Sequence, residues 1–63
     1  MKYQIYLTND IRGIELFAYA HTFQDAVLIV NNRLNRKIIG DSHMSVYSKG
    51  EKLWGKDVES LRY

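Results

Sequence analysis

The chain contains few side chains that could carry out covalent catalysis. His21 and His43 are its only imidazoles and it has no cysteine, so a nucleophile would have to be a serine or threonine activated by one of these histidines. Asp41, Ser42 and His43 include the residue types of a hydrolytic triad, but consecutive residues do not normally point their side chains into one relay. Thr22, which adjoins His21, is better placed to cap a helix. We therefore predict no catalytic residue and no enzymatic activity.

Metal and cofactor binding have equally little support. Asp41 and His43 could lie on the same side of an extended segment, but two ligands are too few for a typical metal site and the sequence indicates no third. No glycine-rich loop follows a predicted strand, so nothing would cradle a phosphate group. We expect no metal, no cofactor and no small-molecule substrate.

The stretch NNRLNRKIIG, residues 31–40, holds three cations and no anion: Arg33, Arg36 and Lys37. The rest of the chain then carries six positive and seven negative charges, because the totals are nine and seven. A net charge of +2 is weak for a dedicated nucleic-acid binder. Cations in the last turns of a helix interact favourably with its dipole, which is our preferred interpretation. Contact with a phosphate or an acidic partner is the alternative.

The length of 63 residues indicates a single domain over residues 1–63 with a thin core. Without cysteine the fold cannot use disulfides, so packing or a partner must stabilise it. The opening MKYQIYLTND lacks the apolar run of a secretory signal, and the longest apolar run, Ala26 to Val30, is too short to span a bilayer. These features predict a cytoplasmic protein with no membrane contact.

Two segments near the start alternate apolar and polar residues with the period of a strand, residues 3–7 and 14–20. Turn-forming residues lie between them, so the pair is predicted to form a hairpin. Residues directly opposite each other share a face, and one register gathers the apolar residues on the face that forms the core. It places Leu7 opposite Leu16, Ile5 opposite Ala18, Tyr3 opposite Ala20 and Tyr6 opposite Phe17.

The next segment has the signals of a helix. Thr22 with Asp25 three residues later resembles an N-terminal capping box. An apolar stripe follows at three- and four-residue steps to about Lys37, and Gly40 is placed to end the helix. Leu28 falls on the solvent side and is a second candidate contact for a partner.

The last third of the chain predicts a second hairpin, with strands over 44–48 and 51–54 joined by a Lys49-Gly50 turn. Its register places Val46 opposite Leu53 in the core and Ser45 opposite Trp54 on the other face. A short helix could start at Asp57. The whole pattern predicts an α+β fold of ββαββ order, with one helix on one face of an antiparallel four-stranded sheet.

Both predicted registers send aromatic side chains to the face that the helix does not cover. These residues are Tyr6, Phe17, Tyr19, Tyr47 and Trp54. Such exposure is unusual in a small monomer, so the five residues form our candidate partner-binding face. Self-association, a different protein partner and stacked bases of single-stranded nucleic acid would each cover it. Alternatively, the C-terminal tail folds back over the face with Val58, Leu61 and Tyr63, or long side chains such as Lys2 and Lys52 lie across it.

The succession KYQIYL, AHTFQDAV and SVYSKGEKLW resembles that of small uncharacterised ββαββ proteins of bacterial and phage genomes. This resemblance implies an accessory factor and, for phage-encoded proteins, one that inhibits a host protein by binding it. It carries no functional residue over. We expect a non-enzymatic binding protein whose partner is a protein or a second copy, with nucleic-acid binding as the alternative.

Overall fold

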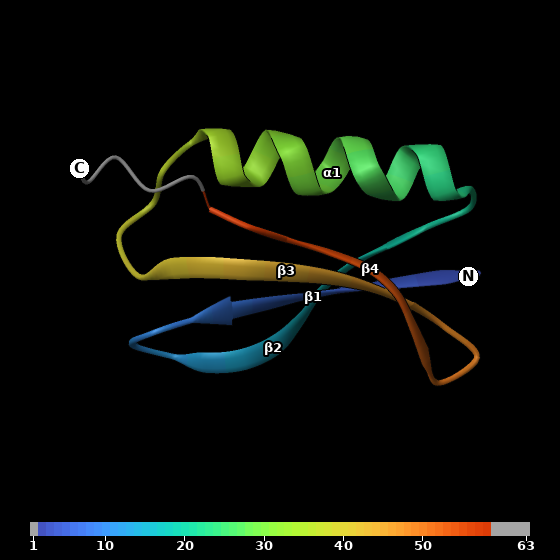
Figure 1. Cartoon of the computed structure of the whole chain (residues 1–63), viewed down its shortest axis with the longest axis horizontal. Helices are drawn as coiled ribbons and strands as arrows, with labels where there is room; N and C mark the ends of the chain where they lie inside the picture. Colours follow the sequence, from blue (N-terminus) through green and yellow to red (C-terminus); the bar gives the residue numbers. More distant parts are fainter. Residues whose placement is uncertain (1, 59–63) are drawn as a thin grey trace.

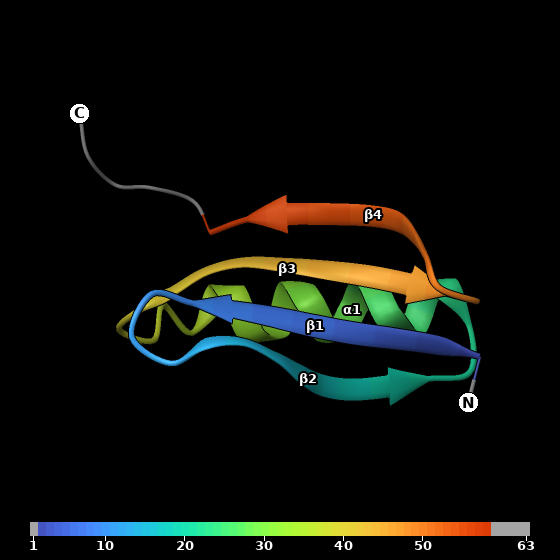
Figure 2. The same cartoon turned by 90° about the horizontal axis from the view of Figure 1, so that it is seen from below.

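A computed structural model describes residues 2–58 and confirms the α+β fold of ββαββ order (Figure 1). The elements are β1 (Tyr3–Asn9), β2 (Gly13–Ala20), α1 (Phe23–Asn35), β3 (Asp41–Ser48) and β4 (Glu51–Asp57). The four strands form one antiparallel sheet in the order β2-β1-β3-β4. Helix α1 lies along one face of this sheet, as Figure 2 shows from the opposite side.

The predicted helix signals are present, although the helix ends earlier than expected. The Thr22 hydroxyl accepts a hydrogen bond from the Asp25 amide at 3.1 Å, which satisfies one of the free amides of the first turn. Helix α1 ends at Asn35 rather than near Lys37, and Lys37 adopts a left-handed φ of 53°. Gly40, with a φ of 93°, shapes the turn into β3 instead of ending the helix.

The second hairpin turn is formed by Lys49 and Gly50, as predicted. Both residues have positive φ angles, 55° and 78°. A two-residue turn of this kind matches the right-handed twist of the flanking strands. The turn therefore brings β3 and β4 together at Ser48 and Glu51, which are directly opposite each other.

The core lies between α1 and the two central strands. It consists of Ile5, Leu7, Ala20, Ala26, Val30, Leu34, Met44 and Val46. Ile5 and Leu7 come from β1, and Met44 and Val46 from β3, so the alternating residues of both strands supply one apolar layer. Because these strands are the inner pair of the sheet, the helix covers the centre of the face and leaves the two outer strands more open.

Three strands each contain one residue that has no opposite partner, which is the signature of a β-bulge. These residues are Phe17 in β2, Ser42 in β3 and Leu53 in β4. One extra residue moves every later side chain of that strand to the other face. The two predicted hairpin registers, which contained no bulges, are therefore correct on one side of the Phe17 and Leu53 bulges and wrong on the other.

In the first hairpin the bulge places Leu16 on the face opposite the helix and Phe17 on the helix side, the reverse of the prediction. The predicted pairs of Ile5 with Ala18 and Tyr3 with Ala20 are confirmed. Beyond the bulge, Tyr6 faces Leu16 rather than Phe17, so Leu16 lies away from the helix. The expected position of Phe17 beside Tyr6 is wrong, because its ring lies on the helix side, with the Arg33 guanidinium 5.1 Å from the ring centroid.

In the second hairpin the bulge moves the tryptophan. Val46 is opposite Trp54, whereas Leu53 had been predicted there, and Leu53 is exposed. The ring of Trp54 lies on the helix side, 6.3 Å from the ring of Phe23 and packed edge-on. The prediction that Trp54 lies on the helix-free face is therefore wrong.

The last residues that the structure describes differ from the expected pattern. Strand β4 continues to Asp57, where a short helix could have begun, and the rest of that predicted helix lies outside the described residues. The Val58 amide donates to the Ser42 carbonyl at 2.9 Å, and its side chain packs against the helix-side core. Val58 therefore does not cover the other face of the sheet, and Leu61 and Tyr63 lie outside the described residues.

Candidate binding surface on the open face

The face of the sheet opposite α1, called the open face here, is lined by tyrosines together with aliphatic and small polar residues. Tyr6, Tyr19 and Tyr47 remain on it from the five predicted aromatic residues. Leu16 pairs with Tyr6, and Ile14 pairs with Thr8, so the bulge in β2 adds two aliphatic side chains to this face. The open face is thus less aromatic than predicted but remains strongly apolar along β2.

A groove of about 410 Å³ runs across the open face between β2 and β3. It is lined by Gln4, Tyr6, Thr8, Ile14, Ser45, Tyr47 and Gly50. The rings of Tyr6 and Tyr47 meet edge to face with centroids 5.2 Å apart, which fixes one wall. None of the lining side chains carries a formal charge at neutral pH. The groove therefore offers aromatic surface, hydroxyl groups and an amide, and suits a partner with apolar and hydrogen-bonding groups.

An imidazole and a carboxylate lie at one end of the open face. His43 is opposite Thr8, and its Nδ1 lies 2.6 Å from Oδ1 of Asp57. A Cβ placed on Gly55 would lie 2.9 Å from His43 Nε2, so the ring packs closely over the glycine backbone. The Asp57 side chain is 84% exposed. Water therefore reaches this pair, and we infer a role in positioning the end of β4.

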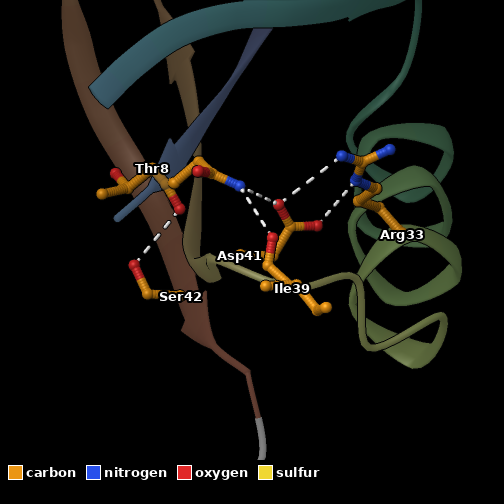
Figure 3. A network of polar contacts seen from close by, with 6 residues as sticks. Thr8, Arg33, Ile39, Asp41 and Ser42 are labelled. Carbon is orange, nitrogen blue, oxygen red and sulfur yellow. Dashed lines mark hydrogen bonds and ion pairs between the residues drawn. The ribbon is translucent and has the colours of Figure 1, made fainter. Parts of the chain in front are cut away.

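A polar network on the helix side joins the ends of three elements (Figure 3). The Asp41 carboxylate, which is completely buried, accepts from Arg33 Nε at 2.8 Å and from Asn9 Nδ2 at 2.9 Å. Asn9 Oδ1 in turn accepts from the amides of Ile11 and Arg12, which closes the first hairpin. The network therefore locks β3 to the helix and to the β1–β2 turn.

The three residues with triad chemistry point to three different partners. Asp41 contacts Arg33, the Ser42 hydroxyl donates to the Thr8 carbonyl at 3.2 Å, and His43 contacts Asp57. Within residues 2–58, no hydrogen bond connects these three side chains to one another. They therefore do not form a relay in this arrangement.

The basic stretch separates into one buried contact and two exposed cations. Arg33 is paired with Asp41, whereas Arg36 caps the helix end and Lys37 follows it, both exposed. A small hollow of about 190 Å³ lies between the helix and β2, lined by Phe17, Ile29, Asn32, Arg33 and Arg36. The sequence did not indicate this hollow, because the bulge that places Phe17 there leaves no mark in the apolar run.

Three remaining predictions concern an exposed leucine, metal binding and membrane contact. Leu28 is exposed on the outer side of α1, as expected. In the described part of the chain, no group of three or more histidine, aspartate or glutamate side chains could hold a metal ion. Similarly, α1 is too short and too polar to cross a membrane.

Comparisons with known proteins add no functional assignment. No protein-family model, curated protein or solved structure was found to match this chain. The function is therefore inferred from the geometry and chemistry of the open face itself.

Proposed function

We propose that this protein is a non-enzymatic binding module that contacts a protein partner through the open face. The observation that supports this most directly is the groove whose wall is the Tyr6–Tyr47 ring pair. Tyrosine is favoured at protein interfaces because its ring buries a large area while its hydroxyl can still form a hydrogen bond. Such a groove would accept an apolar side chain from the partner and leave polar groups at its rim.

Further apolar surface extends the groove along β2. Ile14 lines the groove, Leu16 is exposed next to it, and Tyr19 continues the row towards the end of the strand. Adjacent exposed apolar side chains on a small domain are typical of an interaction surface. A partner that covers them would also add to the thin hydrophobic core of a chain of this length.

Nucleic acid is less well supported than protein. Binding of single strands combines stacking on rings with cations that follow the backbone. Lys52 lies opposite Tyr47, but the basic stretch is on the helix side, and Arg33 is already paired with Asp41. The resemblance to phage and bacterial ββαββ proteins agrees with protein binding, and inhibition of a bound host protein is the activity that it would add.

Affinity capture with matched variants tests the proposal. The wild-type protein, the Tyr6→Ser/Tyr47→Ser double variant and Ile39→Ser would be used as baits in parallel, after circular dichroism has shown that each is folded. Ile39 is exposed in the loop between α1 and β3 and does not line the groove, so its variant controls for loss of an apolar surface residue. We expect a protein that the wild type and Ile39→Ser retain and the double variant loses. Identical capture by all three baits would contradict the proposal.

Fluorescence anisotropy with short single-stranded oligonucleotides tests the alternative. Measurements at about 50 mM and about 200 mM salt separate backbone contacts, which weaken steeply with salt, from nonelectrostatic contacts. We expect no binding at either concentration. Salt-dependent binding that is lost in the Tyr6→Ser/Tyr47→Ser variant would instead assign the open face to nucleic acid.

A further inference from the structure

The two outer strands of the sheet differ in how they are protected against pairing with another strand. An outer strand exposes backbone groups that can pair, and proteins commonly block this with lysines, prolines or bulges. Strand β4 carries Lys52 and Lys56, whereas β2 has no lysine or proline and a single charge, Glu15. Both strands contain one bulge, so the bulge does not distinguish them. Strand β2 is the unprotected edge.

The side chains of β2 are apolar and accessible as well. Ile14 is 71% exposed and Leu16 is 42% exposed, and Phe17 and Tyr19 are exposed beside them. Figure 2 shows β2 as the last strand on its side of the sheet, with no described element beyond it. An edge of eight residues with this composition is suited to adding another strand.

We propose that a second copy of this chain pairs with β2 in antiparallel orientation, so that the two sheets become one. The twofold axis passes midway between the Leu16 residues of the two copies and runs perpendicular to the sheet. The inference rests on the proposed function, because it names one protein partner and the strand that it contacts. It also extends that function, since this symmetry places both open faces on the same side as one continuous surface.

The register follows from the faces that the side chains occupy. Leu16 of each copy meets Leu16 of the other on the open face. Because Phe17 is an extra residue, Ile14 of one copy then meets Tyr19 of the other, also on the open face. These contacts cover the outer flank of each of these side chains, while the open face itself stays accessible.

The charges on the helix side complement each other in the same register. Glu15 lies on this side because it is opposite the buried Leu7. An axis between the two Leu16 residues places Glu15 of one copy opposite Phe17 of the other, at the hollow that Arg33 and Arg36 line. Arg33 is paired with Asp41, whereas neither Glu15 nor Arg36 forms an ion pair within residues 2–58. The pairing therefore brings Glu15 and Arg36 together twice.

Cysteine cross-linking tests the position of the axis, since the natural chain has no cysteine. The two copies of a residue that face each other across a twofold axis between paired strands lie close enough for a disulfide. Leu16→Cys should therefore cross-link rapidly to a covalent dimer under mild oxidation. Leu53→Cys is the matched control, because Leu53 is 47% exposed on the opposite edge. We expect it to cross-link at least tenfold more slowly. Equal rates would overturn the assignment of β2.

Charge exchange tests the contact between Glu15 and Arg36 without changing the open face. Light scattering after gel filtration, over about 10 µM to about 1 mM protein, would give the dimer dissociation constant. Glu15→Arg and Arg36→Glu should each weaken the dimer by about tenfold, because each places like charges at both copies of the contact. The combined variant should restore the dimer, because it places opposite charges there again. Additive weakening in the double variant would refute the register.

Three outcomes separate this inference from the proposed function. A wild-type protein that is monomeric at the highest concentration overturns the β2 pairing, while variant-dependent capture can still support the open face. A dimer that Tyr6→Ser/Tyr47→Ser dissociates and charge exchange leaves intact also overturns the pairing, because contact is then face to face. A dimer that charge exchange dissociates and restores supports it, even if capture finds no foreign partner.

Discussion

Ile5 in β1 and Val46 in β3 lie directly opposite each other and are completely buried beneath α1. One residue further along each strand, Tyr6 and Tyr47 point to the other side and remain partly accessible. The same two strands therefore build a closed layer and an open one. We propose that the buried face provides stability and the open face binding, and substitutions on each face should then separate the two properties.

The largest expected effect is the loss of a core side chain. Ile5→Ala should destabilise the fold by about 2–5 kcal/mol, because it removes buried methyl groups and leaves a cavity. A domain of this size is expected to have a total stability of only about 3–9 kcal/mol. Urea unfolding followed by circular dichroism would measure the loss, and Ile5→Val, at about 0.5–1.5 kcal/mol, keeps the measurement in range.

Ile14→Ala is the matched control for this prediction, since it makes the same change at an exposed site on the open face. We expect a change of at most about 0.5 kcal/mol. Comparable losses at Ile5 and Ile14 would show that the two faces do not differ in their contribution to stability.

The second prediction concerns two side-chain contacts of aspartates, one on each side of the sheet. Asp41→Ala removes the buried acceptor of Arg33 and Asn9 and should cost about 2–4 kcal/mol, because Arg33 loses its partner and Asn9 Nδ2 keeps only the long bond to the Ile39 carbonyl. Asp57→Ala removes the exposed partner of His43 and should cost less than about 1 kcal/mol. Thermal and urea unfolding of both variants would compare them. A larger loss for Asp57→Ala would break the distinction between the faces.

A pair of glycines isolates one contact within the polar network. Gly40 and Gly13 have nearly the same φ, 93° and 92°, so an alanine is strained at either position by about 1–2 kcal/mol. A Cβ at Gly40 would lie 2.8 Å from Asn9 Oδ1, whereas at Gly13 it would meet nothing within 4 Å. Gly40→Ala should therefore cost about 1–2 kcal/mol more than Gly13→Ala. Equal unfolding midpoints for the two variants would show that the Asn9 side chain can move aside.

The elements of the fold were predictable because their signals are local. Thr22 and Asp25, three positions apart, mark the helix start through a local hydrogen bond. Lys49 and Gly50 mark a turn through their backbone conformation. The alternation of residues 3–7 follows directly from burial of one side of β1. Each signal involves residues only a few positions apart, so the sequence pattern predicts it.

The membership of the open face was less predictable because the bulges lie within apolar runs. Leu16 to Ala20 are all apolar or aromatic, so no polar side chain distinguishes a regular register from a bulged one. Leu53 and Trp54 present the same ambiguity. Consequently, Tyr6, Tyr19 and Tyr47 were placed correctly, whereas Phe17 and Trp54 were not.

The polar network could not be predicted because its members are distant in the sequence. Asn9 and Asp41 are separated by 32 positions and come together only when β3 pairs with β1. Arg33 looked like a general dipole or phosphate contact, since the predicted third strand began at residue 44 and did not include its buried partner Asp41. Long-range polar contacts of this kind depend on the sheet order, which the pattern of single elements leaves open.

The smallest expected effect is on the open face, where the Tyr6–Tyr47 ring pair forms the groove wall. Tyr47→Ala should cost only about 0.5–1.5 kcal/mol, because the rings contact each other edge to face but are not enclosed. A double-mutant cycle with Tyr6→Ala should give a coupling of about the same size. Tyr19→Ala is the control, since Tyr19 is exposed and has no ring partner among the described residues.

The cycle also distinguishes two origins of the Tyr6–Tyr47 contact. If the pair is there to bind a partner, its removal should abolish capture while the protein keeps nearly all its stability. If the pair instead contributes to the fold, Tyr47→Ala should approach the cost of Ile5→Ala, because the ring would then close a second core. Parallel measurement of urea unfolding and capture on the same variants decides between them, and only the first result agrees with an open face used for binding.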